Sequence, residues 1–380
     1  MSCFKPMIDI PVWGPLFHLN HTSLCSIYAV SLYIDYYIIC HSCITYQKYK
    51  YGLMLFHLIL PLIFSPVQPA YVTSYIAYPW FMTALGTYVV KIHKQSTSFQ
   101  TWFKSIVLEG LTDIKPSGET AQFGAARKVL NVVSGLAFAQ VFLNPLLPLD
   151  PHVLCQYPWY STKSMYYSVL MGFKGYILMN CSALCLAVIQ LVSGIDTIQV
   201  FNRPFLATSL QDFWGRRWNL IVRNLFFKQV YHHPETVTGK NKFGRWRAFL
   251  LSALIHEVIM SLVNRQITLE NFGFFMVQGL GVAIERSLLT RSPLLRHMVT
   301  LLFLSLAGKL FLLPFIRSPE LILIINKAKR EKSTGTIYKF GIILKQTQGG
   351  VDDFGKQDST CVTLEEEHLS ATIMLKLLEL

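Results

Sequence analysis

Residues 165–192 read MYYSVLMGFKGYILMNCSALCLAVIQLV, an apolar run whose single charged residue is Lys174. A helix needs about 20 apolar residues to cross the roughly 30 Å hydrocarbon core of a bilayer, and this run is longer than that. Within lipid, only helices and closed barrels satisfy all their backbone hydrogen bonds. The run is continuous and does not alternate as a barrel strand does. It therefore predicts a transmembrane helix.

Seven further stretches have the same character. They cover residues 22–46, 52–66, 71–92, 129–149, 247–264, 271–287 and 297–316. The sequence is 52% hydrophobic and only 14% charged, which is too little charge to cover the surface of a soluble globular protein. This composition also excludes a disordered chain, a disulfide-stapled secreted module and a nucleic-acid-binding domain. We predict an all-α, polytopic integral membrane protein with about eight transmembrane helices.

The charge of the chain is unevenly distributed. Residues 1–326 hold 26 Lys and Arg against 13 Asp and Glu, whereas residues 327–380 hold eight of each. We predict a membrane-embedded domain over 1–326 and a polar tail over 327–380 that is either disordered or an artefact of the gene model. The loop of about 196–246 is the most basic connection, and the positive-inside rule places it in the cytosol.

The cysteines do not indicate a metal site. Cys40-His41-Ser42-Cys43 has redox or zinc spacing, but no second pair completes a tetrahedral site. Several other cysteines lie inside apolar runs, where Cys behaves as a small hydrophobic residue. We therefore predict no bound metal.

The first candidate site is Ser209–Asn219, which reads SLQDFWGRRWN. One interpretation is an interfacial helix, because Trp is enriched at headgroup depth and Arg reaches lipid phosphates. Another is a binding site for an anionic cofactor that carries an aromatic ring, such as coenzyme A. Arg binds phosphate through two parallel hydrogen bonds and also stacks on rings. Composition alone leaves both interpretations open.

The second candidate site is His256, in the middle of the predicted helix 247–264. Ionisable side chains at that depth are costly and usually mark a functional site or pathway. Ser252 lies one turn earlier on the same face and is able to orient the ring. The alternative is a neutral histidine that is hydrogen bonded inside the bundle, with Glu257 as a structural neighbour.

Together, these two segments resemble the wax synthase-like branch of the membrane-bound O-acyltransferases. The resemblance rests on Ser209–Asn219, on the pattern from Phe249 through Ser252 to His256-Glu257, and on Phe274–Gly279 with Glu285. It covers about residues 200–290, and the flanking helices agree only in hydropathy. The branch includes fungal acetyltransferases that modify terpenoids and meroterpenoids. This chain departs from the pattern at Ala253, where the family usually has Gly, and in its polar tail.

The resemblance implies an acyl-CoA-dependent O-acyltransferase of the endoplasmic reticulum membrane. We predict that it transfers an acetyl group from acetyl-CoA, or another acyl group, to a lipophilic alcohol such as a terpenoid. Long-chain wax or sterol ester synthesis is the alternative. His256 is then the general base, and Asn219 donates a hydrogen bond to the oxyanion or to the leaving sulfur. The residues predicted to bind acyl-CoA, which is a co-substrate and not a permanently bound cofactor, are Trp214, Arg216, Arg217 and Trp218.

Two other classes of membrane protein fit the sequence less well. A transporter also carries intramembrane His and Glu and basic loops, but it gives no reason for the string at 213–219, and no paired broken helices are evident. A membrane prenyltransferase needs two Asp-rich clusters to hold magnesium diphosphate, whereas Asp196 and Asp212 are isolated. The expected partners are therefore a lipophilic alcohol, acyl-CoA and the bilayer, and not nucleic acid.

Overall fold

The computed structural model describes residues 8–41, 98–112, 120–148, 150–226, 244–288 and 292–318, together with Pro6, Phe56, 59–60 and 63–66. The helix predicted over 71–92, the second cysteine of the Cys40–Cys43 pair and the polar tail predicted over 327–380 lie outside these residues. The division of the chain at residue 326 therefore stays a prediction.

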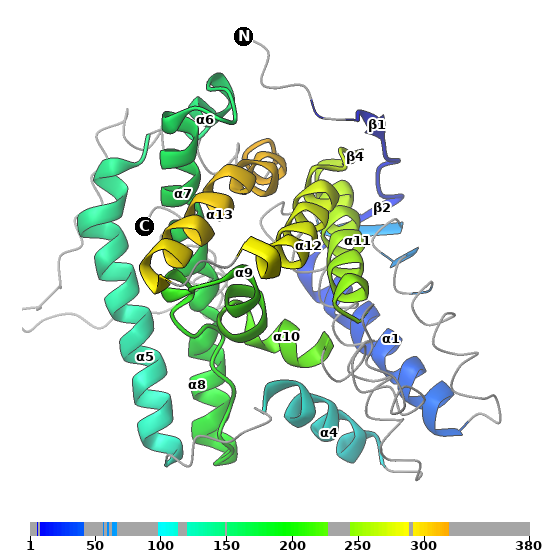
Figure 1. Cartoon of the computed structure of the whole chain (residues 1–380). Helices are drawn as coiled ribbons and strands as arrows, with labels where there is room; N and C mark the ends of the chain where they lie inside the picture. Colours follow the sequence, from blue (N-terminus) through cyan, green and yellow to red (C-terminus); the bar gives the residue numbers. More distant parts are fainter. Residues whose placement is uncertain are drawn as a thin grey trace, which may run out of the picture. The chain divides into compact units, whose positions relative to one another are not determined.

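The described part is mostly helical (Figure 1). The helices before the first candidate site are α1 (His21–His41), α4 (Phe99–Leu111), α5 (Ala121–Phe138), α6 (Val153–Gln156), α7 (Thr162–Asn180) and α8 (Ser182–Ser193). Helix α5 continues through a π-helical turn, η2 (Ala139–Leu143), and a 3-10 turn, η3 (Asn144–Leu146). The 3-10 turn η4 (Pro204–Leu206) follows α8. The first candidate site itself forms α9 (Leu210–Asp212) and the π-helical turn η5 (Phe213–Arg217).

The remaining helices are α10 (Leu220–Phe226), α11 (Gly244–Asn264), α12 (Glu270–Leu288) and α13 (Pro293–Ile316). Four short strands correct the all-α prediction. Strand β1 (Ile10–Pro11) pairs antiparallel with β4 (Gln266–Ile267), and β2 (Phe17–Leu19) pairs in parallel with β3 (Phe64–Pro66). The helix predicted over 52–66 therefore does not continue through its last three residues.

Four described helical segments are long and apolar enough to cross a bilayer. They are Ala121–Leu146, Thr162–Ser193, Trp246–Asn264 and Pro293–Ile316. They correspond to the spans predicted over 129–149, 165–192, 247–264 and 297–316. Helices α1 and α12 form where spans were predicted over 22–46 and 271–287, but neither is among these four. The chain is thus a mostly helical membrane protein with four candidate spans in its described part, half of the predicted number.

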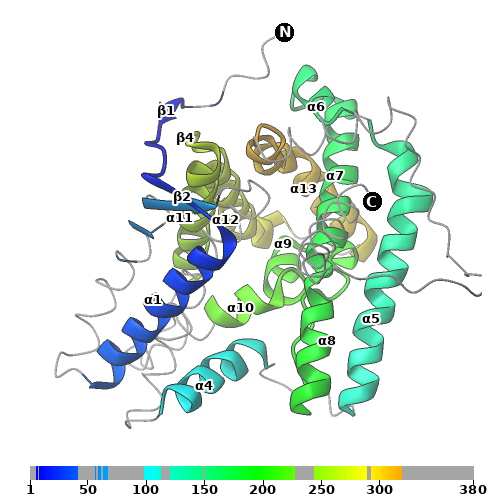
Figure 2. The same ribbon diagram turned by 180° about the vertical axis from the view of Figure 1, so that it is seen from behind.

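Helices α11, α12 and α13 form the framework of the candidate site. Ala253 of α11 is completely buried and packs with Phe274, Phe275 and Ala307 in one core cluster. Two glycines of α12 allow close approach. A Cβ at Gly281 would lie 2.6 Å from the Phe303 ring, and one at Gly279 would lie 3.2 Å from the Cβ of Phe249. Figures 1 and 2 show α9 and α10 between the α11–α12 pair and α7.

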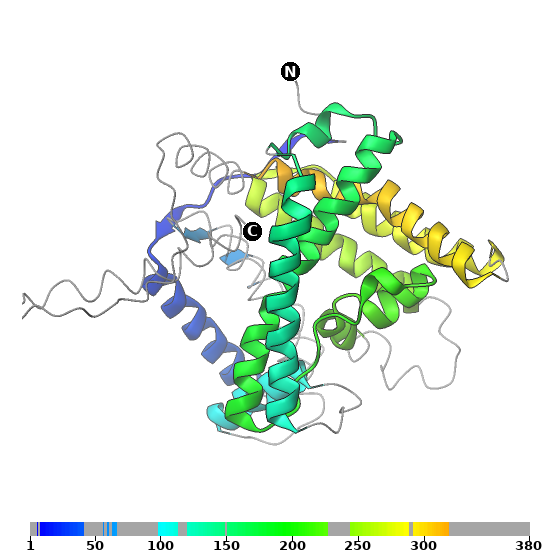
Figure 3. The same ribbon diagram turned by 90° about the vertical axis from the view of Figure 1, so that its left-hand side faces the viewer.

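A second pair of helices, α5 and α8, packs side by side (Figure 3). A Cβ at Gly124 would lie 2.3 Å from the side-chain amide of Gln190, so the glycine allows the two helices to approach closely. The Oε1 atom of Gln190 accepts hydrogen bonds from the Lys128 ammonium, at 2.6 Å, and from the Thr197 hydroxyl, at 3.0 Å. This contact satisfies a buried cation inside the helix pair.

Candidate active site

One cavity of about 620 Å³ brings most of the predicted site residues together. Its walls come from α7, η4, α9, η5, α10, α11, α12 and α13. The sequence-predicted residues that line it are Trp214, Trp218, Asn219 and His256, whereas Arg216 and Arg217 do not line it. Its volume lies within the range of about 300–1,000 Å³ that is usual for ligand pockets.

The π-helical turn η5 determines how the string at 213–217 faces the cavity. The Ser209 hydroxyl accepts a hydrogen bond from the Asp212 amide at 2.8 Å and caps α9. The Trp218 amide then donates to the carbonyl of Phe213 at 2.9 Å, five residues back. The last turn before Asn219 is therefore a π turn and not an α-helical turn.

Trp214 and Trp218 are positioned by contacts with other side chains of the protein. The indole N–H of Trp214 donates to Oε1 of Gln278 at 3.1 Å, and its ring lies against Phe249 and Phe275. The ring of Trp218 stacks on Phe213, with centroids 5.1 Å apart. These rings pack on α11, α12 and each other, whereas Gly215 and Arg216 of the same string are exposed. Packing on the protein therefore positions the two tryptophans, and the interfacial-helix interpretation stays open.

Asn219 has a left-handed backbone conformation, and its side chain caps helix α10. Its φ of 37° lies in the left-handed region, which Asn tolerates better than most residues. Its Oδ1 accepts a hydrogen bond from the Val222 amide at 3.3 Å, as an N-cap of α10. Since Oδ1 is occupied in this way, the amide group Nδ2 is left as a donor with no partner among the described residues. Asn219 lines the cavity.

His256 is oriented by the backbone of its own helix. Its Nδ1 lies 2.8 Å from the carbonyl oxygen of Ser252. A carbonyl only accepts, so Nδ1 carries the proton and Nε2 of the neutral ring is a proton acceptor. No described residue is bonded to Nε2. The ring rests on Phe275, with centroids 4.3 Å apart. The predicted contribution of Ser252 is therefore real, but it comes from the carbonyl group and not from the hydroxyl.

Glu257, the neighbour of His256, has a structural task. Its carboxylate accepts hydrogen bonds from the amides of Thr268 at 3.0 Å, Leu269 at 2.7 Å and Phe272 at 3.2 Å. It is buried and holds the turn from α11 into the first turn of α12, where a negative charge is also favoured by the helix dipole. The carboxylate does not line the cavity.

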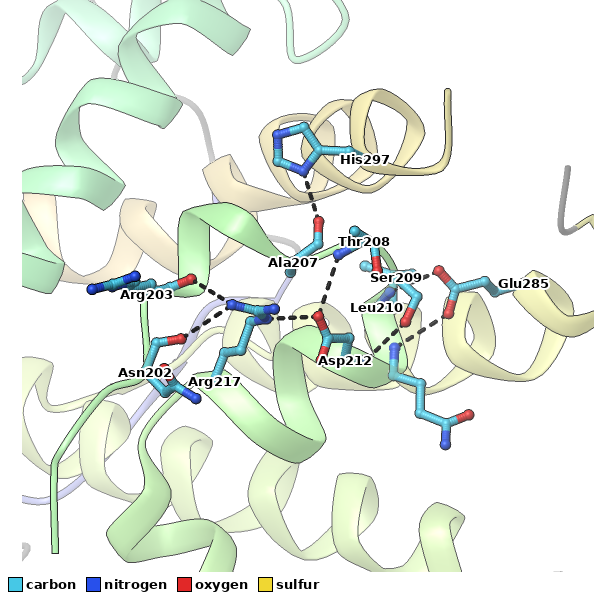
Figure 4. Close-up of polar contacts among 11 residues, drawn as sticks. Asn202, Arg203, Ala207, Thr208, Ser209, Leu210, Asp212, Arg217, Glu285 and His297 are labelled. Carbon is cyan, nitrogen blue, oxygen red and sulfur yellow. Dashed lines mark hydrogen bonds and ion pairs between the residues drawn. The ribbon is translucent and has the colours of Figure 1, made fainter. Parts of the chain in front are cut away.

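Arg217 bonds to residues of the same loop that carries the tryptophans (Figure 4). Its Nε lies 2.6 Å from Oδ2 of Asp212. One of its terminal nitrogens donates to the carbonyl groups of Asn202 and Arg203, at 3.5 and 3.3 Å. Arg216 is exposed. The structure thus brings neither arginine to the cavity wall.

Two residues from other helices hold the same loop (Figure 4). The carboxylate of Glu285, on α12, accepts from the amides of Leu210 at 2.7 Å and Gln211 at 3.2 Å. Nδ1 of His297, on α13, donates to the carbonyl of Ala207 at 2.8 Å. All three bonds involve the loop backbone, so they fix its position whatever side chains it carries.

Arg223 is a site residue that was not singled out from the sequence. It lies on α10, four residues after Asn219, and both residues line the cavity. Its Nε is buried and has no hydrogen-bond partner among the residues that the structure describes. The spacing of four residues between Asn219 and Arg223 was the signal for this residue in the sequence. The predicted cofactor-binding residues were instead the adjacent Arg216 and Arg217.

The comparisons with known proteins concern the same part of the chain. Residues 198–277 match the membrane bound O-acyl transferase family. We call these residues the O-acyltransferase segment. It contains Trp214, Asn219, Arg223, His256 and Phe275, and therefore one complete wall of the cavity.

Several plant enzymes are similar to this chain. A probable long-chain-alcohol O-fatty-acyltransferase 8 of Arabidopsis thaliana is 39% identical over 135 residues, which is 32% of this chain and 40% of that protein. A long-chain-alcohol O-fatty-acyltransferase of Simmondsia chinensis is 38% identical over 127 residues, 31% of this chain and 36% of that protein. An acyl-CoA–sterol O-acyltransferase 1 of Arabidopsis thaliana is 32% identical over 126 residues, 31% of this chain and 36% of that protein. This chain thus matches less than half of the length of these relatives.

Proposed function

We propose that this protein is an acyl-CoA-dependent O-acyltransferase that esterifies a lipophilic alcohol within the membrane. The observation that carries the proposal is the pairing of two complementary groups in one cavity. His256 presents the unprotonated Nε2 and Asn219 presents the N–H groups of Nδ2. Acyl transfer to an alcohol needs one proton acceptor and one oxyanion donor.

The proposed reaction uses these two groups in sequence. The alcohol oxygen attacks the thioester carbonyl carbon while Nε2 of His256 takes the hydroxyl proton. The carbonyl oxygen becomes an oxyanion that accepts a hydrogen bond from Nδ2 of Asn219. The tetrahedral intermediate collapses, the carbon–sulfur bond breaks, and the imidazolium returns its proton to the thiolate. The products are an ester and the coenzyme A thiol, and His256 is neutral again.

Arg223 is the best-placed cation for the acyl donor. It lines the cavity one helical turn from Asn219, and no ion pair satisfies its guanidinium among the described residues. We therefore assign to it the contact with an anionic group of coenzyme A. Arg216, exposed on η5, is our proposed contact for the part of the donor outside the cavity. Trp214 and Trp218 supply aromatic surface at the cavity wall.

The similar plant enzymes favour the alternative of the sequence analysis over its first choice. Their names specify long-chain alcohols or sterols as acceptors and, in two of the three, fatty acyl groups as donors. We propose a long-chain acyl group in place of acetyl and a long-chain alcohol or sterol in place of a terpenoid. We also propose the endoplasmic reticulum as the location of this integral membrane protein.

The experiment compares donors and acceptors in one assay. Membranes from cells that express the chain are incubated with radiolabelled palmitoyl-CoA or acetyl-CoA and with hexadecanol, a sterol or a terpenoid alcohol. We expect palmitoyl esters of hexadecanol or of the sterol. Membranes from cells with an empty vector provide the background. Acetyl esters of the terpenoid alone would instead support the first choice of the sequence analysis, and no ester in any pair would overturn the proposal.

A further inference from the structure

A second wall of the cavity comes from α7 and α13, outside the O-acyltransferase segment. Ser168, Gly172, Gly175 and Met179 of α7 all line the cavity. Their spacings of four, three and four residues place them on a single face of the helix. From Ser168 to Met179 this face extends about 16 Å, at 1.5 Å per residue. It is therefore a continuous strip along one side of the cavity.

The two glycines of this strip differ from the packing glycines of α12. A Cβ at Gly172 or at Gly175 would meet no atom within 4 Å, whereas one at Gly281 would be 2.6 Å from the Phe303 ring. A glycine inside a helix destabilises it relative to Ala. Close helix packing explains that cost at Gly281 but not on α7. The space beside Gly172 and Gly175 is cavity.

Ser168 is at the end of the strip that lies against α13. Its side chain is only 4% exposed, and its hydroxyl has no hydrogen-bond partner in the described part of the chain. The hydroxyl oxygen is covered by protein atoms, so the surface that the strip presents to the cavity is apolar. A Cβ on Gly308 of α13 would lie 3.6 Å from the Cβ of Ser168.

Contacts along α13 connect this end to His256. Phe311 lies one turn after Gly308, and its ring centroid is 6.2 Å from that of His256. The Ser168 end of the strip thus contacts α13 one turn before the ring that packs near the proposed base. Gly172, Gly175 and Met179 follow at increasing distance from Ser168 along α7.

We propose that this face of α7 binds a straight hydrocarbon chain, and that Gly172 and Gly175 set the longest chain accepted. The inference rests on the proposed function. The chain belongs to either the alcohol or the acyl donor, since both are long and both end in an oxygen function at the reacting centre. The absence of side chains at 172 and 175 leaves a smooth wall, and Met179 adapts to the chain end because its side chain is flexible.

The test measures chain-length profiles of Gly172→Leu and Gly175→Leu in membranes. One series varies the alcohol from decyl to octadecyl with palmitoyl-CoA, and the other varies the acyl donor over the same lengths with one alcohol. A few added methyl and methylene groups in an apolar pocket change selectivity by about tenfold or more. We expect kcat/KM for octadecyl chains to fall by about tenfold while decyl chains stay near the wild-type value. The series that responds identifies the source of the chain.

The matched control is Ala137→Leu, which adds a large apolar side chain to an exposed position of α5. Its profile should equal that of the wild type. A wild-type profile in both glycine variants would overturn the inference while leaving the proposed function intact. If either leucine variant fails to accumulate, Gly172→Ala and Gly175→Ala replace it, because Ala favours the helix.

A labelling experiment separates the inference from the proposed function. If the wild type transfers no acyl group, the proposed function fails, but a photoactivatable octadecyl alcohol still reports on binding. Labelling of residues 162–180 that Gly175→Leu reduces would support a chain-binding face. Absent labelling, or labelling that Gly175→Leu does not change, would overturn it.

Discussion

The two walls of the cavity, one from the O-acyltransferase segment and one from α7, differ in the side chains that they present. In the O-acyltransferase segment, each predicted catalytic group has one side bonded to protein and the other presented to the cavity, as Asn219 and His256 show. On α7, the cavity face carries two glycines with open space beside them. Under the proposed function, the first wall fixes atoms where bonds change, and the second leaves room for a substrate. We therefore expect substitutions in the first wall to lower the reaction rate, and substitutions in the second wall to change which chain lengths are accepted.

The largest effect is expected at His256. His256→Ala should lower the rate by about 10² to 10⁴, the usual contribution of a positioned base. The amount of folded protein should persist, because the single bond of the ring, to Ser252, lies within its own helix. Activity normalised to monodisperse protein in detergent is the measurement. Normal specific activity with less folded protein would mean that His256 is structural, and the distinction between the walls would be lost.

At Asn219, two substitutions separate its cap from its donor. Asn219→Asp keeps an acceptor for the Val222 amide and tolerates the positive φ, but it has no N–H group for an oxyanion. It should fold normally and lose about 10² to 10³ in kcat. Asn219→Ala should lose the same activity and also about 0.5–2 kcal/mol of stability. Thermal unfolding in detergent compares the two variants. Full activity in Asn219→Asp would remove Asn219 from the mechanism.

The two arginines test which cation contacts the donor. Arg223→Gln should raise KM for acyl-CoA roughly tenfold, as expected for loss of a charge-assisted hydrogen bond, with little change in unfolding temperature. Arg217→Gln is its matched control, because Arg217 pairs with Asp212 and holds the loop. It should lower the unfolding temperature and leave KM unchanged. The opposite pattern would return the donor contact to Arg217.

The smallest effect is expected at Ser252. Ser252→Ala removes the hydroxyl but keeps the carbonyl that orients His256. Specific activity should stay within about twofold of the wild type, since no catalytic contact is lost. A loss of tenfold or more would mean that the hydroxyl, and not the backbone, sets the ring.

Part of the fold and of this site was predictable from the sequence. Long apolar runs predicted helices over 129–149, 165–192, 247–264 and 297–316, and four candidate spans cover these stretches with shifted bounds, because hydropathy and length decide whether a helix crosses a bilayer. His256 was predictable because an ionisable group at that depth is rare. Trp214, Trp218 and Asn219 were found because their string is distinctive, and all three line the cavity.

The rest depends on three-dimensional details that a sequence does not display. Arg217 pairs with Asp212 within η5 and α9, and Arg223 is the arginine that lines the cavity among the described residues. The strands β1 to β4 are two or three residues long and carry no periodic signal. Glycine is common in transmembrane helices, so Gly172 and Gly175 look no different in the sequence from Gly279 and Gly281. The two pairs differ in the atoms that a Cβ at each position would meet, which only the structure shows.

The π turn also decides how the site responds to the loss of one residue. A π turn holds one residue more than the α turn it replaces, and each residue of an α-helix turns the chain by about 100°. Deleting Gly215 would convert the bond from the Trp218 amide to the Phe213 carbonyl from an i→i+5 to an i→i+4 bond. Trp218 would still lie one turn after Phe213, so Trp218 and Asn219 would keep their direction. Deleting one residue from the α-helical turns of α11 before His256 would instead rotate the earlier residues of that helix by about 100° relative to His256. The number of residues is therefore constrained more strictly in α11 than in η5.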